Sequence, residues 1–120
     1  MTVPPQCNFA GRLVQRLGAS SCLIDAATGE TIGPLDMPRL VSSFGAGLIS
    51  AGLRKGDRIL IGCLLAPSSG IAYLGAMYAG LVPVPVEEGA LVSSGESLVQ
   101  GCGARAVWTE RSHRFDWARD

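Results

Sequence analysis

Positions 59–86 form a run without a single charged residue. A helix of about 20 apolar residues is enough to cross a bilayer, so hydrophobicity alone would admit a membrane span. Two breaks argue against one, because the segment 66–70 contains Pro and Gly, and Gly80 is soon followed by Pro83 and Pro85. The pieces have the lengths of a strand, a helix and a strand, as in a parallel βαβ unit buried on both faces. We therefore expect no membrane span.

Composition limits the class of partner and the compartment. Ten basic and ten acidic side chains cancel, so no net charge favours nucleic acid or an anionic membrane. The chain of 120 residues suits one domain. Its amino terminus lacks the basic segment and apolar core of a signal peptide, and we expect a cytoplasmic protein. Four widely separated cysteines and one histidine indicate neither a zinc site nor a disulfide framework.

A helix and a small hairpin are expected near the amino terminus. Asn8 can cap a first helix that ends at Gly18, and its apolar side chains share one face: Phe9, Leu13, Val14 and Leu17. Segments 22–25 and 30–32 flank a turn, so they are expected to pair as a small hairpin.

The second helix is expected to begin after Asp36, as N-cap, and to end at Gly52. Two glycines lie inside it, Gly45 and Gly47. Each costs about 1 kcal/mol relative to Ala, and close packing against a sheet would explain their presence. We therefore expect this helix to lie on the sheet.

From residue 58 onward the pattern alternates between strands and helices. Strands are expected at 58–65, 81–86 and 104–109, and helices at 69–79 and from Ser93 to the glycines at 101 and 103. Ser93 and Glu96 have the spacing of a capping box. Pro83 and Pro85 cannot donate hydrogen bonds, so their strand should be an edge or bulged strand. The order predicts an α/β fold, a small three-layer domain with a mainly parallel sheet flanked by helices, plus the hairpin.

Three segments occur in an order that points to a family. They are Gly52-Leu-Arg-Lys-Gly-Asp-Arg-Ile-Leu-Ile, Ala72-Tyr-Leu-Gly-Ala-Met-Tyr-Ala-Gly-Leu-Val-Pro-Val-Pro-Val and Gly103-Ala-Arg-Ala-Val. Together they resemble the N-terminal region of adenylate-forming (AMP-binding) enzymes, which include acyl-CoA synthetases, fatty-acyl-AMP ligases, aryl-CoA ligases and peptide-synthetase adenylation domains. The resemblance implies that residues 1–120 form a single, incomplete N-terminal subdomain, with 110–120 as a tail or the start of a truncated element.

The activity implied by the resemblance belongs to the parent ligase. It uses ATP and Mg²⁺ to convert a carboxylic acid into an acyl-adenylate, and then forms a thioester with CoA or with a carrier-protein thiol. In the family, the phosphate loop ending in Pro-Lys-Gly, the acidic Mg-associated segment, the ribose-binding Asp and the late catalytic Lys lie further along. None has a counterpart in this sequence. We therefore expect no catalytic, cofactor-binding or metal-binding residue in this chain and no activity from it alone, and whether the parent activates a fatty or an aromatic acid stays open.

Weaker candidates for chemistry are better explained structurally. Segment 93–101 superficially resembles a phosphate loop, but Glu96 has the wrong charge and no Lys follows, so a capped helix is favoured. Lys55 lies in a polar turn and is expected to be solvated. His113 and Asp116 could form an acid–base pair, but no nucleophile with a defined position accompanies them.

Aromatic residues suggest a surface for a partner. Trp108, Phe115 and Trp117 lie near the end of the sequence and form our candidate interface. Tyr73 and Tyr78 could line a substrate wall in the parent enzyme or belong to the core. The expected partner is the remainder of the ligase or another protein chain, with self-association into a homo-oligomer because exposed sheet edges tend to be covered. The alternative is a stand-alone interaction or assembly module derived from the same fold.

Overall fold

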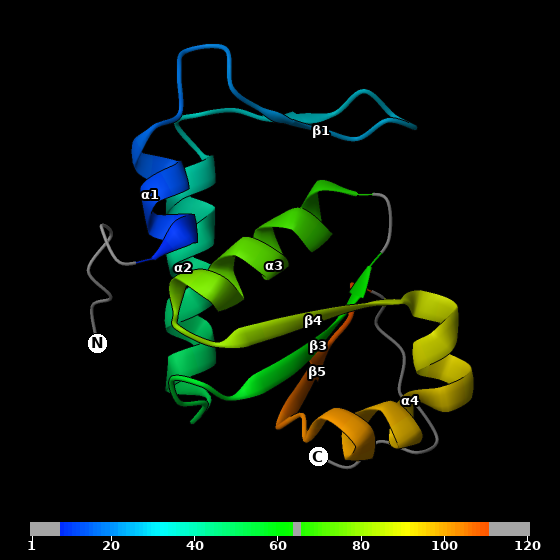
Figure 1. The fold of residues 1–120 in the computed structure, drawn as a ribbon. Coiled ribbons are helices and arrows are strands. Elements are labelled where there is room, and N and C mark those ends of the chain that lie inside the picture. Colours follow the sequence, from blue (N-terminus) through cyan, green and yellow to red (C-terminus); the bar gives the residue numbers. More distant parts are fainter. Residues whose placement is uncertain (1–7, 64–65, 111–120) are drawn as a thin grey trace.

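Strands and helices alternate along the chain in the computed structural model, which describes residues 8–63 and 66–110 (Figure 1). The elements in chain order are α1 (Phe9–Gln15), β1 (Leu23–Ile24), β2 (Thr31–Ile32), α2 (Met37–Ser50), β3 (Arg58–Cys63), α3 (Pro67–Tyr78), β4 (Val82–Glu87), α4 (Glu88–Cys102) and β5 (Ala106–Trp108). The first two strands pair antiparallel as the expected hairpin. No helix among the described residues combines the length and the hydrophobicity needed to span a bilayer.

The main sheet is parallel, with the strand order β4-β3-β5. Ile59 and Ile61 of β3 pack into a cluster with Ala72 of α3, whereas Leu60 packs against Leu91 of α4 on the other face. Helices α1, α2 and α3 therefore lie on one side of the sheet and α4 on the opposite side (Figure 1). This confirms the expected three-layer α/β fold with an N-terminal hairpin.

Strand β4 is an edge strand within the described residues, as its two prolines predicted. Pro83 and Pro85 stand opposite Ile59 and Ile61 in the parallel register with β3. A proline has no backbone N–H, so both are tolerated where the strand has a neighbour on one side only.

The close approach at α2 is made to a helix, which corrects the expectation that its glycines pack against the sheet. A Cβ atom at Gly45 would lie 2.8 Å from the carbonyl oxygen of Gly75 in α3. A Cβ at Gly75 would in turn lie 2.7 Å from Cδ1 of Phe44. Gly47 has nothing within 4 Å, so packing does not explain it. Helix α2 still reaches the sheet, since Phe44 packs against the cluster that contains Ile59.

Helix α1 is capped as predicted. The side-chain oxygen of Asn8 accepts a hydrogen bond of 3.0 Å from the backbone N–H of Gly11, and its amide donates to the carbonyl oxygens of Met77 at 2.8 Å and Tyr78 at 3.2 Å. These bonds hold α1 against the end of α3 through the side that carries its buried residues, Ala10 and Gly11. Phe9 is left 65% exposed. Of the apolar side chains expected on one face, Leu13, Val14 and Leu17 are half-buried and Phe9 is exposed.

Helix α4 begins earlier than the capping-box pattern indicated. It starts at Glu88, directly after β4, and consists of two helical pieces joined by a kink at Ser94, where φ is −137° and ψ is 17°. The helix expected from Ser93 to the glycines at 101 and 103 corresponds to the second piece. The Ser93 hydroxyl donates 3.0 Å to the carbonyl oxygen of Gly89. Ser93 therefore lies inside the helix and does not cap it.

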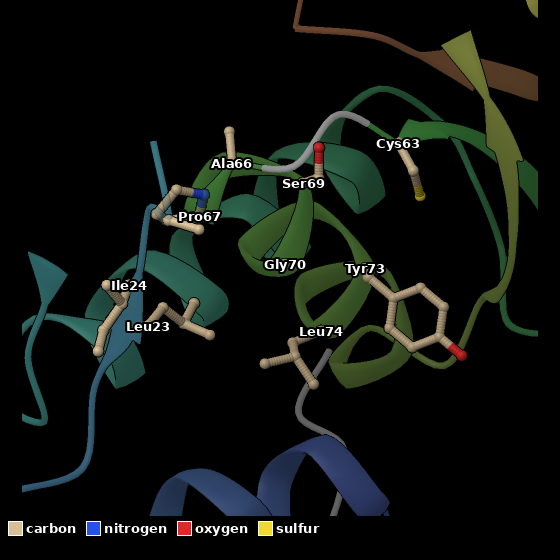
Figure 2. Close-up of a pocket in the computed structure, with 10 residues that line it drawn as sticks. Leu23, Ile24, Cys63, Ala66, Pro67, Ser69, Gly70, Tyr73 and Leu74 are labelled. Carbon is tan, nitrogen blue, oxygen red and sulfur yellow. The ribbon is translucent and has the colours of Figure 1, made fainter. Parts of the chain in front are cut away.

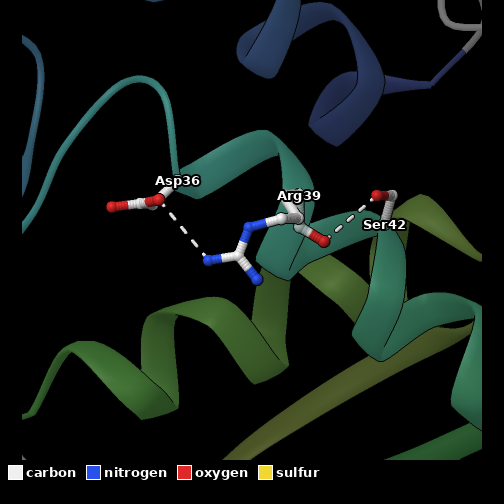
Figure 3. Close-up of polar contacts among 3 residues, drawn as sticks. All are labelled: Asp36, Arg39 and Ser42. Carbon is white, nitrogen blue, oxygen red and sulfur yellow. Dashed lines mark hydrogen bonds and ion pairs between the residues drawn. The ribbon is translucent and has the colours of Figure 1, made fainter.

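Helix α2 begins where expected, but Asp36 makes no capping hydrogen bond because its own backbone is already helical. Its carboxylate forms an ion pair of 3.4 Å with Arg39, three residues along, and the Ser42 hydroxyl donates to the carbonyl oxygen of Arg39 (Figure 3). Both partners of the ion pair are exposed, so it contributes at most about 1 kcal/mol.

Candidate functional site at the carboxyl edge of the sheet

The topology of the sheet indicates where a ligand would bind. In open parallel sheets, ligands bind beyond the carboxyl ends of the strands, where successive connections leave for opposite faces. Here α3 and α4 cover opposite faces and β3 lies between β4 and β5. The change of direction therefore falls between β3 and β5, and the residues at their carboxyl ends form the candidate site.

A buried carboxylate joins the strand ends at this edge. Glu88, the first residue of α4, is 5% exposed. The Thr109 hydroxyl donates to its two carboxylate oxygens, at 2.9 Å for Oε2. A Cβ atom at Gly62 would lie 2.7 Å from Glu88 Oε2, so only glycine leaves room for the carboxylate beside β3. The interaction ties the β4–α4 junction to the end of β5, and the amino terminus of α4 favours the negative charge there.

One groove beside the edge is almost entirely apolar. It has a volume of about 470 Å³ and lies between the hairpin and the amino-terminal half of α3 (Figure 2). Its lining residues are Leu23, Ile24, Ala26, Cys63, Ala66, Pro67, Ser69, Gly70, Tyr73 and Leu74. Because none of them carries a formal positive charge, this groove suits an apolar group better than a phosphate.

A second groove, which we call the acidic groove, has a volume of about 440 Å³. Its apolar side chains come from the hairpin, α2, α3 and β5 and include Ile32, Leu40, Phe44, Ile71 and Trp108. The rings of Phe44 and Trp108 meet edge to face, with centroids 5.9 Å apart and planes at 82°. Three carboxylates also line it, those of Asp25, Glu30 and Glu110, and none of the described residues that line it is basic. That charge disfavours an anionic ligand such as a nucleotide.

The comparison with known proteins decides the family. The model of the AMP-binding enzyme family matches residues 14–119, which is most of the chain. This chain belongs to the AMP-binding enzyme family.

Similar proteins and solved structures support the assignment to this family. The chain is similar to 4-coumarate--CoA ligase-like 1 of Arabidopsis thaliana, with 30% identity over 113 residues that cover 94% of this chain and 20% of the relative. The N-terminal subdomain of NpsA from Klebsiella oxytoca has a similar fold, with a TM-score of 0.75 and 21% identity over 96% of this chain and 29% of that one. ATP-bound MatB from Rhodopseudomonas palustris gives a TM-score of 0.72 and 21% identity over 83% and 20%. The chain spans 13% to 20% of the length of the curated relatives it matches.

The candidate interface residues of this AMP-binding family member are only partly within the described residues. Trp108 lies in β5, is half-buried and lines the acidic groove against Phe44. Phe115 and Trp117 fall outside the described residues, as do His113 and Asp116. The interface they were expected to form stays a prediction.

The other candidates take structural positions in this part of the AMP-binding fold. Segment 93–101 is helical, as expected, and belongs to α4. Lys55 is exposed in the turn after α2 and lines neither of the two grooves. Tyr73 lines the apolar groove, whereas Tyr78 packs against the cluster of Met37 and Val41. Within residues 8–63 and 66–110, no three His, Cys, Asp or Glu side chains gather as a metal site.

The pairing of Glu88 with Thr109 was missed by sequence reasoning. A signal was present, because Gly62 lies inside an expected buried strand, where glycine often marks the close approach of another group. The identity of that group depends on where α4 begins, and the sequence pattern misplaced that point. A carboxylate expected in a loop was therefore found in the core.

Proposed function

We propose that this chain is the amino-terminal structural part of an ATP-dependent ligase that activates an acyl or aryl carboxylate. In the parent enzyme, ATP and Mg²⁺ would give the acyl-adenylate, and a thiol of CoA or a carrier protein would then take the acyl group. The match of residues 14–119 to the AMP-binding family carries the proposal. The similarity to 4-coumarate--CoA ligase-like 1 and to the ATP-bound structure of MatB supports it.

The chain alone is proposed to be inactive. Adenylyl and phosphoryl transfer depend on positive groups and N–H donors that stabilise the negative charge of the transition state. None of the described residues that line the two grooves is Lys or Arg, and the charged residues that line the acidic groove are all carboxylates. The described residues at this edge therefore form part of the wall of a site, and other residues of the parent enzyme would supply the catalytic groups.

ATP–pyrophosphate exchange tests this proposal. The purified chain of 120 residues is assayed with a panel of fatty and aromatic acids, and the expected exchange equals that of a heat-killed control. Turnover above that control would overturn the inactive assignment. The coding sequence after Asp120 tests the ligase itself, because an in-frame phosphate loop supports the ligase and a native stop codon contradicts it.

A second candidate function is a stand-alone interaction module of the same fold. Large apolar side chains on its surface favour this candidate, namely Phe9 at 65% exposure and Leu35 at 91%. Such side chains tend to be covered by a partner when they cluster with polar rims. A native stop after Asp120 together with stable binding of another chain would support the module over the ligase part.

A further inference from the structure

One exposed face of α1 combines an aromatic ring with positive charge. Phe9 and Arg12 lie in α1 at the three-residue spacing that places side chains on the same side of a helix, and Arg16 follows as the C-cap residue directly after Gln15. All three are exposed, and the opposite side of α1 is held against α3 by Asn8. Among the described residues the ion pair joins Asp36 and Arg39, so neither Arg12 nor Arg16 is neutralised there. We call these three residues the basic face.

The acidic groove has the complementary character. Asp25 is fixed at its rim, since its carboxylate accepts hydrogen bonds from the backbone N–H groups of Ala27 at 2.9 Å and Thr28 at 3.2 Å. Glu30 and Glu110 are exposed at the rim, and within the described part of the chain neither forms an ion pair. The apolar lining between these carboxylates includes the half-buried rings of Phe44 and Trp108.

We propose that copies of this chain associate by docking the basic face of one copy into the acidic groove of another. Phe9 would enter the apolar part of the groove, and the two arginines would meet the carboxylates at its rim. The match rests on opposite charge around an apolar centre, the arrangement that gives protein interfaces their specificity. The groove has a volume of about 440 Å³, large enough to receive an aromatic side chain. The contact concerns the 120-residue chain, since residues of the parent ligase that complete this edge would compete for the same groove, and it is therefore tested separately from the ligase proposal.

The two surfaces differ, which determines the kind of assembly. A contact between unlike patches is head to tail, and it forms a closed ring or an open row. We therefore expect the average mass to rise with protein concentration. We also expect the association to weaken as salt is added, because exposed charges are screened within about 8 Å at physiological ionic strength.

Sedimentation velocity on the complete chain of 120 residues tests the contact with two variants. The groove variant carries E30K and E110K, and the face variant carries F9S, R12S and R16S. Each is expected to be monomeric at concentrations where the unmodified chain associates. Mixed together, they still offer one intact face and one intact groove. The mixture is therefore expected to form a 1:1 heterodimer that does not grow further.

Matched controls separate the contact from general charge effects. Arg54 and Glu96 are exposed and belong to neither surface, so R54E and E96K are expected to associate like the unmodified chain. Circular dichroism checks that every variant is folded. If one variant does not fold, exchanging the charges within one chain, as R12E and R16E with E30K and E110K, gives a second test and is expected to restore association.

Three results would overturn the proposal. The unmodified chain could remain monomeric at every concentration, as it would if another part of the same chain filled the groove. Both variants could associate as the unmodified chain does, which would place the contact elsewhere. The folded variants could also stay monomeric when mixed, which would show that the basic face and the acidic groove do not bind each other.

Discussion

The two crossover connections of the sheet are stabilised in different ways. Helix α3, between β3 and β4, packs through small residues, with Gly75 beneath Phe44 and Ala72 and Ala76 fully buried. Helix α4, between β4 and β5, is kinked and begins with a buried carboxylate that binds Thr109. The first connection is fixed by shape and the second by a polar contact. Crossover connections of the same βαβ kind can thus be stabilised either by close packing of small residues or by a buried polar contact, and each makes its own prediction.

The largest effect is expected where α2 crosses α3. In Gly45→Ala the new methyl group meets the backbone oxygen of Gly75, which cannot move without shifting the helix, so we expect a loss of about 2–3 kcal/mol in the free energy of unfolding. Urea denaturation measures it. The control is Gly47→Ala in the same helix, where nothing lies within 4 Å and helix propensity should add about 1 kcal/mol. Equal effects at both positions would contradict packing by shape.

The polar contact of the second connection is tested by Glu88→Ala. Removing the carboxylate leaves the Thr109 hydroxyl without this acceptor and is expected to cost about 2 kcal/mol. The same urea titration measures the change. Glu87→Ala is the control, because Glu87 is exposed at the neighbouring position and its loss should stay within about 0.5 kcal/mol. If Glu87→Ala lowers the free energy of unfolding as much as Glu88→Ala, the buried contact contributes no more than an exposed side chain.

The sequence predicts the first connection well, but it does not predict the acidic groove. The uncharged run contains its own breaks at Pro67 and Gly80, so β3, α3 and β4 were predicted close to their observed bounds. The edge position of β4 followed from its prolines. The acidic groove, in contrast, is assembled from the hairpin, α2, α3 and β5, and no local pattern brings these segments together.

The start of α4 shows a second limit. Ser93 and Glu96 provide a good local capping pattern, but a helix beginning at Glu88 also buries a carboxylate beside Gly62 and gives it the Thr109 hydroxyl. The tertiary contact outweighs the local preference. Likewise, the apolar spacing of α1 does not reveal which of its side chains are covered, and the hydrogen bonds of Asn8 to the end of α3 hold the helix with Phe9 exposed.

A smaller effect is expected where α1 meets the first connection. Asn8→Ala removes the cap and the two bonds to the end of α3, at a cost of about 1–2 kcal/mol. Asn8→Ser keeps a side-chain oxygen for the cap and loses the amide donor, so thermal unfolding should rank it between the original chain and Asn8→Ala. If Ser were as stable as Asn, the bonds to Met77 and Tyr78 would contribute nothing measurable.

The smallest effect is expected at Ser93→Ala in the second connection. The hydroxyl is exposed and bonds within its own helix to the carbonyl oxygen of Gly89, so its loss should change stability by less than about 0.5 kcal/mol. Thermal unfolding beside the unmodified chain measures the difference. A loss of about 1 kcal/mol or more would instead indicate a true helix cap at Ser93.

We propose that this part of the AMP-binding fold supports a nucleotide site in the parent enzyme and does not itself hold the nucleotide. Equilibrium dialysis of the purified 120-residue chain against labelled ATP with Mg²⁺ measures whether it does. We predict no retention of ATP above that of an unrelated protein of similar size, because none of the described residues that line the two grooves is basic. Saturable binding of one ATP per chain would show that the chain holds the nucleotide itself.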